Sequence, residues 1–188
     1  MSHRALRHPS FVLGAILSLA LLAAALLSLV WTPWSPYDMD LANKLQPPST
    51  AHWLGTDVYG RDIVSLLLVG ARSSILVGVV AVGIGVTIGT LLGLLAAARR
   101  GWVEETIMRL SDFTLAFPAI LSAIMLTAVY GAGMVNAMVA IGIYNIPTFT
   151  RLARGAAKSV WGREYILAAR ACGKGPWAIT WQHVLPNI

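Results

Sequence analysis

The chain has 188 residues, of which 57% are hydrophobic and only 12% are charged. Soluble domains carry about 25% charged residues, so this composition excludes an ordinary soluble domain and indicates a membrane protein. The formal net charge is +6, which would suit a nucleic-acid partner only if the bases formed one patch or stripe.

Three long stretches carry no charged side chain: 9–37, 73–98 and 113–150. Each is longer than the roughly 20 residues that cross a bilayer as a helix, and the last is long enough for two crossings. The turn-forming sequence Tyr-Gly-Ala-Gly at 130–133 divides it. The sequence therefore predicts an all-α membrane protein with four spans: 11–31, 75–98, 115–130 and 134–150.

The Lys and Arg residues are distributed unevenly between the segments that join these spans. If the N-terminus is cytoplasmic, 11 of the 14 bases lie on the inner side: Arg4, Arg7, Arg99, Arg100, Arg109, Arg151, Arg154, Lys158, Arg163, Arg170 and Lys174. Only Lys44, Arg61 and Arg72 then lie outside, so the positive-inside rule favours this orientation. Bases that mark one face of a membrane argue against a nucleic-acid partner.

This orientation predicts four parts of the chain. They are a cytoplasmic N-terminus with the first span (1–32), an extracytoplasmic segment (33–74), three further spans (75–150) and a cytoplasmic loop (151–188).

The extracytoplasmic segment contains the sequence LGTDVYGRD, followed by GAR at 70–72. Gly55 and Gly60 permit turns. Thr56 or Asp57 can cap a helix. Asp62 can pair with Arg61 or Arg72 near the membrane interface. Because charged pairs at the ends of elements are usually structural, we expect Asp57 and Asp62 to support the fold and not to be catalytic.

Small residues recur at every fourth position of the second span: Ala81, Gly85, Gly89, Gly93 and Ala97. This spacing places them on one face of a helix, where a second helix can approach closely. We expect a packing seam, and lining of a transport pathway is the alternative.

The inner segment 99–112 leads into the third span. Glu105 and Arg109 are four residues apart, which suits an ion pair on a surface helix. Asp112 lies at the membrane edge and is expected to anchor the helix beside Arg109. Pro118 comes near the start of the span, where a proline costs little or bends the helix.

The fourth span contains two amide side chains and a proline, Asn136, Asn145 and Pro147. Amides are unfavourable in hydrocarbon, so both Asn side chains should face protein or water. Two roles are open to them, the lining of a passage and simple hydrogen bonding between helices.

The segment 163–186 is a charged stretch that follows the last apolar run. Gly173 suits the position just past a helix end and Pro176 prevents continuation, so we expect two short helices joined by a turn. Aromatic and small residues share one face of the first helix: Trp161, Tyr165, Ala168 and Cys172. This face is a candidate docking surface for a soluble partner, and the alternative is a helix lying among lipid headgroups.

Three of these segments resemble one protein family. Residues 167–186 resemble the E-A-A-x3-G-x9-I-x-L-P loop of ABC-importer permeases, with Leu167 in place of Glu and His183 in place of Ile; the matching residues are Ala168, Ala169, Gly173, Leu185 and Pro186. The extracytoplasmic signature resembles that of oligopeptide, dipeptide and nickel permeases, in particular the dipeptide permease C-type subunit, through Leu54, Gly55, Thr56, Asp57, Gly60, Arg61, Asp62, Gly70, Ala71 and Arg72. The third segment resembles the M-R-x-x-D-x-x-L-A-F-P sequence of the same group through Met108, Arg109, Asp112, Leu115, Ala116, Phe117 and Pro118.

The resemblance implies a type I ABC importer permease fold, with an N-terminal span and a five-helix core. In the family two more spans follow the Leu-Pro of the loop, so we expect an incomplete core and a chain truncated at its C-terminus. The implied location is the bacterial inner membrane, with several spans and a cytoplasmic N-terminus.

The resemblance also implies a function. The chain would form part of the translocation pathway for peptides, nickel or related small solutes, and would couple to ATPase subunits through the loop that includes Tyr165. Its implied partners are ABC ATPase subunits, a second homologous permease subunit, an extracytoplasmic substrate-binding protein and membrane lipid. The alternative is a truncated, non-transporting protein that binds the ATPase or the partner permease.

An enzyme is not indicated. The four His residues are scattered, and H-E-x-x-H and G-x-S-x-G are absent, which argues against a membrane protease or transferase. The lone Cys172 suggests neither a disulfide nor a metal site. No G-x-x-x-x-G-K-[ST] is present, so we expect no ATP site in this chain. We also expect no catalytic residue, metal or cofactor, and the resemblance implies that ATP is bound on partner subunits.

Overall fold

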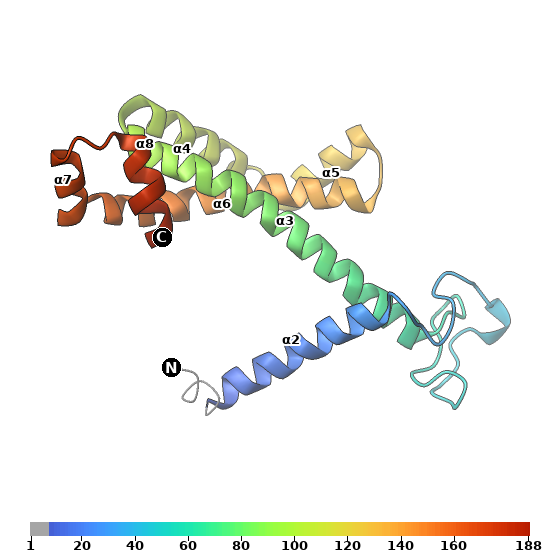
Figure 1. Cartoon of the computed structure of the whole chain (residues 1–188). Coiled ribbons are helices and arrows are strands. Elements are labelled where there is room, and N and C mark those ends of the chain that lie inside the picture. Colours follow the sequence, from blue (N-terminus) through green and yellow to red (C-terminus); the bar gives the residue numbers. More distant parts are fainter. Residues whose placement is uncertain (1–7) are drawn as a thin grey trace. The chain divides into compact units, whose positions relative to one another are not determined.

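The computed structural model describes residues 8–188, apart from the side chains of Ala119 and Ala123. This part of the chain is helical and contains no strand, only one isolated bridge between Thr56 and Asp62. Its helices are α2 (Pro9–Leu27), α3 (Ile63–Arg99), α4 (Gly101–Ala116), α5 (Ala119–Tyr130), α6 (Met134–Trp161), α7 (Glu164–Ala171) and α8 (Pro176–Ile179) (Figure 1). The expected all-α class is confirmed. Arg4 and Arg7, which enter the orientation argument, lie outside the described residues.

Three shorter helical turns complete the described chain: η1 (Leu41–Asn43), the π-helical η2 (Thr180–Val184) and η3 (Leu185–Asn187). The chain forms two compact units that divide between Val77 and Gly78, so α3 begins in the first unit and ends in the second.

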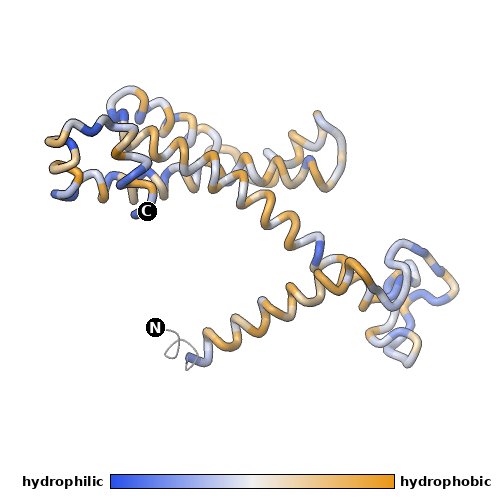
Figure 2. Tube along the Cα trace, in the orientation of Figure 1, coloured by the Kyte–Doolittle hydropathy of each residue, from blue (hydrophilic) through white to orange (hydrophobic). Residues whose placement is uncertain are grey.

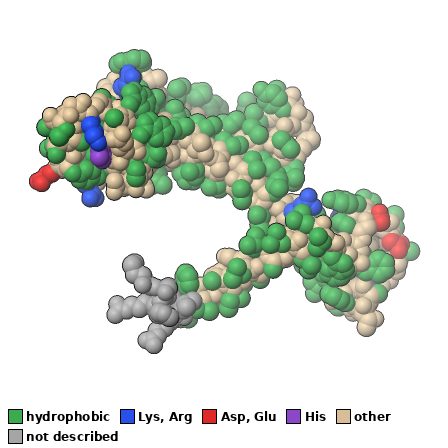
Figure 3. Space-filling model, in the orientation of Figure 1, with side chains coloured by type: hydrophobic (Ala, Val, Ile, Leu, Met, Phe, Trp, Pro, Cys, Tyr) green, Lys and Arg blue, Asp and Glu red, His purple; other side chains and the backbone are tan. Residues whose placement is uncertain are grey.

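In the first unit, α2 is apolar on almost its whole surface. Of its 19 residues only Ala25 is buried, and large apolar side chains such as Leu13 and Leu19 are more than half exposed. Figure 2 shows mostly hydrophobic residues along this helix, and Figure 3 shows hydrophobic side chains on the face in view. A helix that is hydrophobic all round and not covered by protein is typical of a lipid-facing span.

By length and composition, two described helices can cross a membrane, α2 and α3. Helix α3 contains the expected span 75–98 but begins at Ile63. A third crossing exists only if α4 and residues 120–130 are taken as one broken span. The first two expected spans therefore match helices that can cross a membrane, while the third and fourth stay predictions.

The expected third span, 115–130, is not a single helix. The chain bends by 86° between α4 and residues 120–130. Phe117 is extended, with φ −87° and ψ 133°, because the residue before a proline is disfavoured in the helical region. Pro118 therefore ends α4 and does more than bend a continuing helix.

The expected fourth span, 134–150, lies within α6, which continues to Trp161. It is not among the described helices that are apolar enough to span a membrane. Its apolar sequence is interrupted by polar and cyclic residues, which explains why it differs from the expected span: Asn136, Asn145, Pro147 and Arg151.

The expected seam of small residues packs α3 against α6, which confirms the packing interpretation. A Cβ at Gly89 would lie 2.7 Å from the carbonyl oxygen of Ile146, and one at Gly93 would lie 2.6 Å from that of Thr150. Ala81 and Ala97, at the ends of the seam, are 3% and 1% exposed. Only small side chains allow two helices to approach this closely.

Candidate functional site

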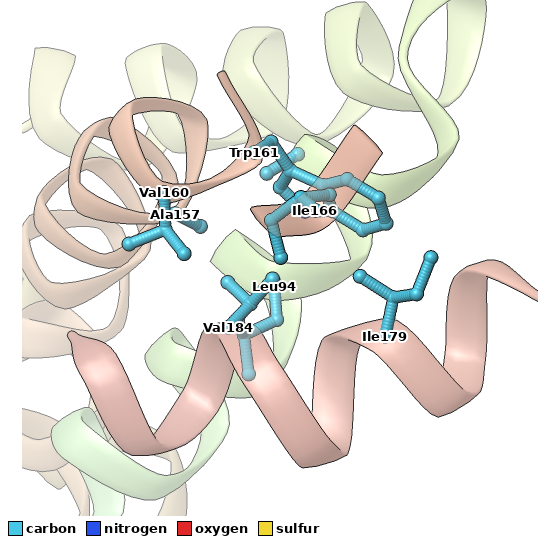
Figure 4. Close-up of a cluster of buried hydrophobic side chains, with 8 residues drawn as sticks. Leu94, Ala157, Val160, Trp161, Ile166, Ile179 and Val184 are labelled. Carbon is cyan, nitrogen blue, oxygen red and sulfur yellow. The ribbon is translucent and has the colours of Figure 1, made fainter. Parts of the chain in front are cut away.

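The segment 164–186 is held to the ends of two long helices by a buried hydrophobic cluster. Figure 4 shows its side chains converging from α3, α6, α7 and the α8–η2 region: Leu94, Ala97, Ala157, Val160, Trp161, Ile166, Ile179 and Val184. Ile166, Ile179 and Val184 are at most 1% exposed. Burying such side chains stabilises a contact by roughly 1.5–3 kcal/mol each, so this segment is fixed to α3 and α6 and does not hang free.

The local sequence explains the shape of the segment. Helix α7 ends at Ala171, and Gly173 follows with φ +81°, a conformation that favours glycine. The N–H of Gly173 donates to the carbonyl of Arg170 at 2.8 Å, and that of Lys174 donates to the carbonyl of Ala169 at 3.1 Å. Pro176 then begins α8. The two short helices and the turn between them are as expected.

The predicted docking face requires one correction. Trp161 ends α6, is only 4% exposed and belongs to the hydrophobic cluster. Gly162 and Arg163 separate it from α7, so Trp161 does not continue the register of that helix. The guanidinium carbon of Arg170 lies 4.9 Å from the centre of the Trp161 ring. The buried Trp161 Nε1 has no hydrogen-bond partner among the described residues.

The exposed surface of the segment is largely apolar. Tyr165 is 41% exposed and Leu167 57%, and Ala168 is also exposed. Cys172 and Gly173 are also exposed, as is Pro186. Ala169 and Leu185, by contrast, are partly buried against the hydrophobic cluster. The motif residues therefore divide into an exposed set that a partner can reach and an inner set that fixes the segment.

Ion pairs join α4 to α6. Glu104 accepts hydrogen bonds from Arg154 and Lys158, and its side chain is only 14% exposed. Arg109 pairs with Glu105 at 2.6 Å, as expected from their spacing. Asp112, which was expected to anchor the helix end beside Arg109, forms an ion pair with Arg151 of α6. The charges thus link two helices that the sequence separates widely.

Asn136 stabilises the turn between α5 and α6. Its Nδ2 donates to the carbonyl oxygens of Tyr130 and Gly131 at 2.9 and 2.8 Å. It also lines a cavity of about 220 Å³ with four other residues: Leu126, Tyr130, Val139 and Ile143. Asn145 is partly buried and faces Gly85 of α3. A role for either amide in a passage stays a prediction.

The LGTDVYGRD signature forms a tight loop in the first unit. Gly55 and Gly60 have φ +80° and +76°, and a Cβ at Gly60 would lie 1.7 Å from the carbonyl oxygen of Asp40. The Asp57 carboxylate accepts from the backbone N–H groups of Tyr59 and Arg61 and pairs with the Arg61 guanidinium at 2.6 Å. Burial alone would raise the pKa of Asp57, but these interactions hold the pKa below its ordinary value.

Asp62, and neither Thr56 nor Asp57, caps the helix that follows. Its Oδ2 accepts from the backbone N–H and the hydroxyl of Ser65 at 2.8 and 2.9 Å. Its partner is His52, whose Nδ1 lies 3.1 Å from Oδ1, and not Arg61 or Arg72 as predicted. Burial alone would raise the pKa of Asp62, but the bonds to Ser65 and His52 hold the pKa below its ordinary value.

Thr56 joins two parts of the same loop: it accepts from the N–H of Gln46 at 2.8 Å and donates to the carbonyl of Asn43 at 2.5 Å. Gly70 and Arg72 are exposed on α3, and no described contact explains their place in the signature. Over residues 8–188, no three His, Cys, Asp or Glu side chains gather as metal ligands would.

Sequence reasoning missed several residues that position these features. Ile166, Ile179 and Val184 anchor the segment 164–186, and their apolar character amid charged neighbours was the available signal. His52, which precedes the LGTD sequence, gave no signal of its pairing with Asp62 because the contact depends on the folded loop.

Comparisons with known proteins place these features in context. Residues 89–188 match the family model described as "Binding-protein-dependent transport system inner membrane component". The chain is 42% identical over 187 residues to the glutathione transport system permease protein GsiD of Pectobacterium atrosepticum, covering 98% of this chain and 62% of that protein.

Two further relatives are 40% identical over 176 residues. One is the probable D,D-dipeptide transport system permease protein DdpC of Escherichia coli, with 92% of this chain and 59% of the relative covered. The other is the dipeptide transport system permease protein DppC of Alkalihalophilus pseudofirmus, with 94% and 58% covered. The chain thus spans about three fifths of the length of these relatives.

Proposed function

The chain belongs to the family of binding-protein-dependent transport system inner membrane components, and from this premise we propose that it is a permease subunit of an ATP-driven importer of peptides or related small solutes. Relatives named for glutathione and dipeptide transport support a peptide-like substrate more than nickel. A permease subunit is a transport component and not an enzyme.

The observation that carries the proposal is the hydrophobic cluster that fixes segment 164–186 to α3 and α6. Leu94 of α3, Val160 of α6 and Ile166 of α7 belong to one buried cluster. A force applied to the exposed side of α7 therefore acts on both long helices through close-packed side chains, which transmit displacement with little loss. Rigid-body movement of helices about an interface is a common way to switch between two states.

The exposed apolar surface of α7 would receive an ATPase subunit. Tyr165, Leu167 and Ala168 offer a contact area that a soluble partner can bury. ATP would be bound and hydrolysed by that partner, since the sequence lacks a phosphate-binding G-x-x-x-x-G-K-[ST] loop. In this proposal segment 164–186 and the N-terminus both lie in the cytoplasm, where the positive-inside rule would put most Lys and Arg residues of the chain.

The remaining partners follow from the same proposal. The folded loop at 33–62 would face an extracytoplasmic substrate-binding protein, and a second, homologous permease subunit would complete the translocation pathway. Asn136 and Asn145 would contribute polar groups to that pathway.

The test uses the chain reconstituted with its partner permease and ATPase subunits. Ala168→Arg adds a bulky charge to the exposed face of α7, so we expect ATPase capture and peptide uptake to fall while membrane insertion is unchanged. Ser159→Arg, at an exposed position near the end of α6, is the matched control and should retain both. Normal capture and uptake in the Ala168 variant would refute the docking surface.

A further inference from the structure

Arg99 and Arg100 are adjacent bases at the turn between α3 and α4. Six other bases of the second unit have a polar or aromatic partner: Arg109 with Glu105, Arg151 with Asp112, Arg154 and Lys158 with Glu104, Lys174 with Gln182 and His183, and Arg170 with the Trp161 ring. Arg99 and Arg100 are exposed, and no ion pair of the described residues includes either. Two adjacent guanidinium groups thus have no counter-charge within residues 8–188.

The turn lies at the level where a bilayer would present its headgroups. The charge-free run 73–98 has 26 residues and ends directly before Arg99. As a helix this run is about 39 Å long at 1.5 Å per residue. A bilayer with its headgroup regions is roughly 40–45 Å thick. A span that uses this run therefore places Arg99 and Arg100 among the phosphates of one leaflet.

Two exposed tryptophans flank the pair. The guanidinium carbon of Arg99 lies 5.7 Å from the centre of the Trp177 ring in α8, and Trp177 is 47% exposed. Trp102, in the first turn of α4, is 77% exposed. Indole rings favour the membrane interface because one part is apolar and the N–H is polar.

The backbone at Arg100 adds an independent observation. Its φ is +50°, a value that side chains other than glycine rarely adopt, and Gly101 follows with φ +58°. Glycine would adopt the Arg100 conformation with less strain. The chain nevertheless places a cation at this position.

We propose that the α3–α4 turn binds the phosphate headgroup of an anionic phospholipid through Arg99 and Arg100. A guanidinium donates two parallel hydrogen bonds to phosphate oxygens, and two adjacent guanidiniums match a negatively charged headgroup better than a zwitterionic one. Because Arg99 also contacts Trp177 of α8, the bound lipid would lie beside segment 164–186. The proposal depends on the membrane location of the chain and not on ATPase coupling.

The experiment uses the full chain in phosphatidylcholine bilayers that contain spin-labelled phosphatidylglycerol or phosphatidylcholine. The motionally restricted fraction of each label gives the preference of the protein for the anionic lipid. The test variants are Arg99→Gln, Arg100→Gln and the double substitution, and a double Arg→Lys variant keeps the charge. Arg163→Gln is the matched control, since Arg163 is exposed, lies outside the turn and has no ion pair among the described residues.

The expected result is a preference for phosphatidylglycerol that falls by up to about fivefold for each guanidinium removed at low ionic strength. The preference should persist in the double Lys variant and in Arg163→Gln, and should weaken in the unmodified chain as salt is raised. An unchanged preference in the double Gln variant, or an equal loss in Arg163→Gln, overturns the proposal. Loss of ATPase capture with lipid preference intact would assign the turn to a protein interface and equally overturn it.

Discussion

Asp112 of α4 forms an ion pair with Arg151 of α6, a residue 39 positions further along the chain. The pair is solvent-exposed, with side chains 63% and 47% accessible, whereas Glu104 on the same helix is 14% exposed and binds both Arg154 and Lys158. The two acidic residues therefore stabilise the α4–α6 contact unequally.

We expect Asp112→Asn to lower the free energy of unfolding by about 0.2–1 kcal/mol, the range for exposed pairs. Glu104→Gln should cost more, because it leaves two cations without a counter-charge at a less exposed site. Thermal unfolding of each variant in detergent micelles, followed by circular dichroism, measures the difference. Equal effects would show that the exposure of the two sites does not decide their contribution.

The seam between α3 and α6 predicts a sharp dependence on glycine position. Gly89→Ala should destabilise the helix pair, because its Cβ would lie 2.7 Å from the Ile146 carbonyl oxygen, a backbone atom that cannot rotate away. Gly83→Ala is the matched control in the same helix, since nothing lies within 4 Å of its Cβ. The control should be neutral or stabilising by up to about 1 kcal/mol through helix propensity. Similar unfolding temperatures for the two variants would contradict the seam.

The cap at Asp62 predicts a dependence on acid. The pKa of Asp62 is lower in the folded chain than its ordinary value of 3.8, so its stabilisation is complete above that value and is lost as the pH falls toward the folded pKa. Asp62→Asn should therefore be less stable at neutral pH and should lose less stability below about pH 4. Asp38→Asn, which removes an exposed acid of the same segment, is the control. If the unmodified chain and both variants lost stability in parallel as the pH falls, the Asp62 cap would be excluded as the source of the acid dependence.

Substitutions at two neighbouring residues distinguish the buried anchors of segment 164–186 from its exposed surface. Ile166 is fully buried and Leu167 is 57% exposed. Ile166→Ala should destabilise the packing by about 2–5 kcal/mol and so loosen α7 from α3 and α6. Leu167→Ala should leave unfolding almost unchanged. Limited proteolysis between 162 and 176, compared for the two variants, reports the loosening, and equal cleavage rates would contradict the proposed anchoring.

The sequence was sufficient to predict features that depend on local pattern. The apolar runs predicted α2 and most of α3, and the spacing of four predicted the seam at Gly85, Gly89 and Gly93. Gly173 and Pro176 predicted the turn between two short helices, because each restricts the backbone in a known way.

Features that depend on contacts between distant residues were not predictable in this way. Arg109 was the nearest base to Asp112 in sequence, but the fold brings Arg151 closer. By its spacing, Trp161 would share a face with Tyr165 if α7 began before residue 161. The helix instead breaks at Gly162, and the Trp161 indole is buried in the hydrophobic cluster. Hydropathy alone did not reveal that Pro118 would end a helix within the expected third span.

The central claim is that the exposed face of α7 binds the ATPase, and Cys172 offers a direct test. It is the single cysteine of the chain and is exposed just after α7. A thiol-directed photo-crosslinker on Cys172, in a complex whose partner subunits lack cysteine, should attach the chain to the ATPase subunit on illumination, and Cys172→Ser should abolish the product. Crosslinking to lipid alone, with the ATPase bound and active, would contradict the account.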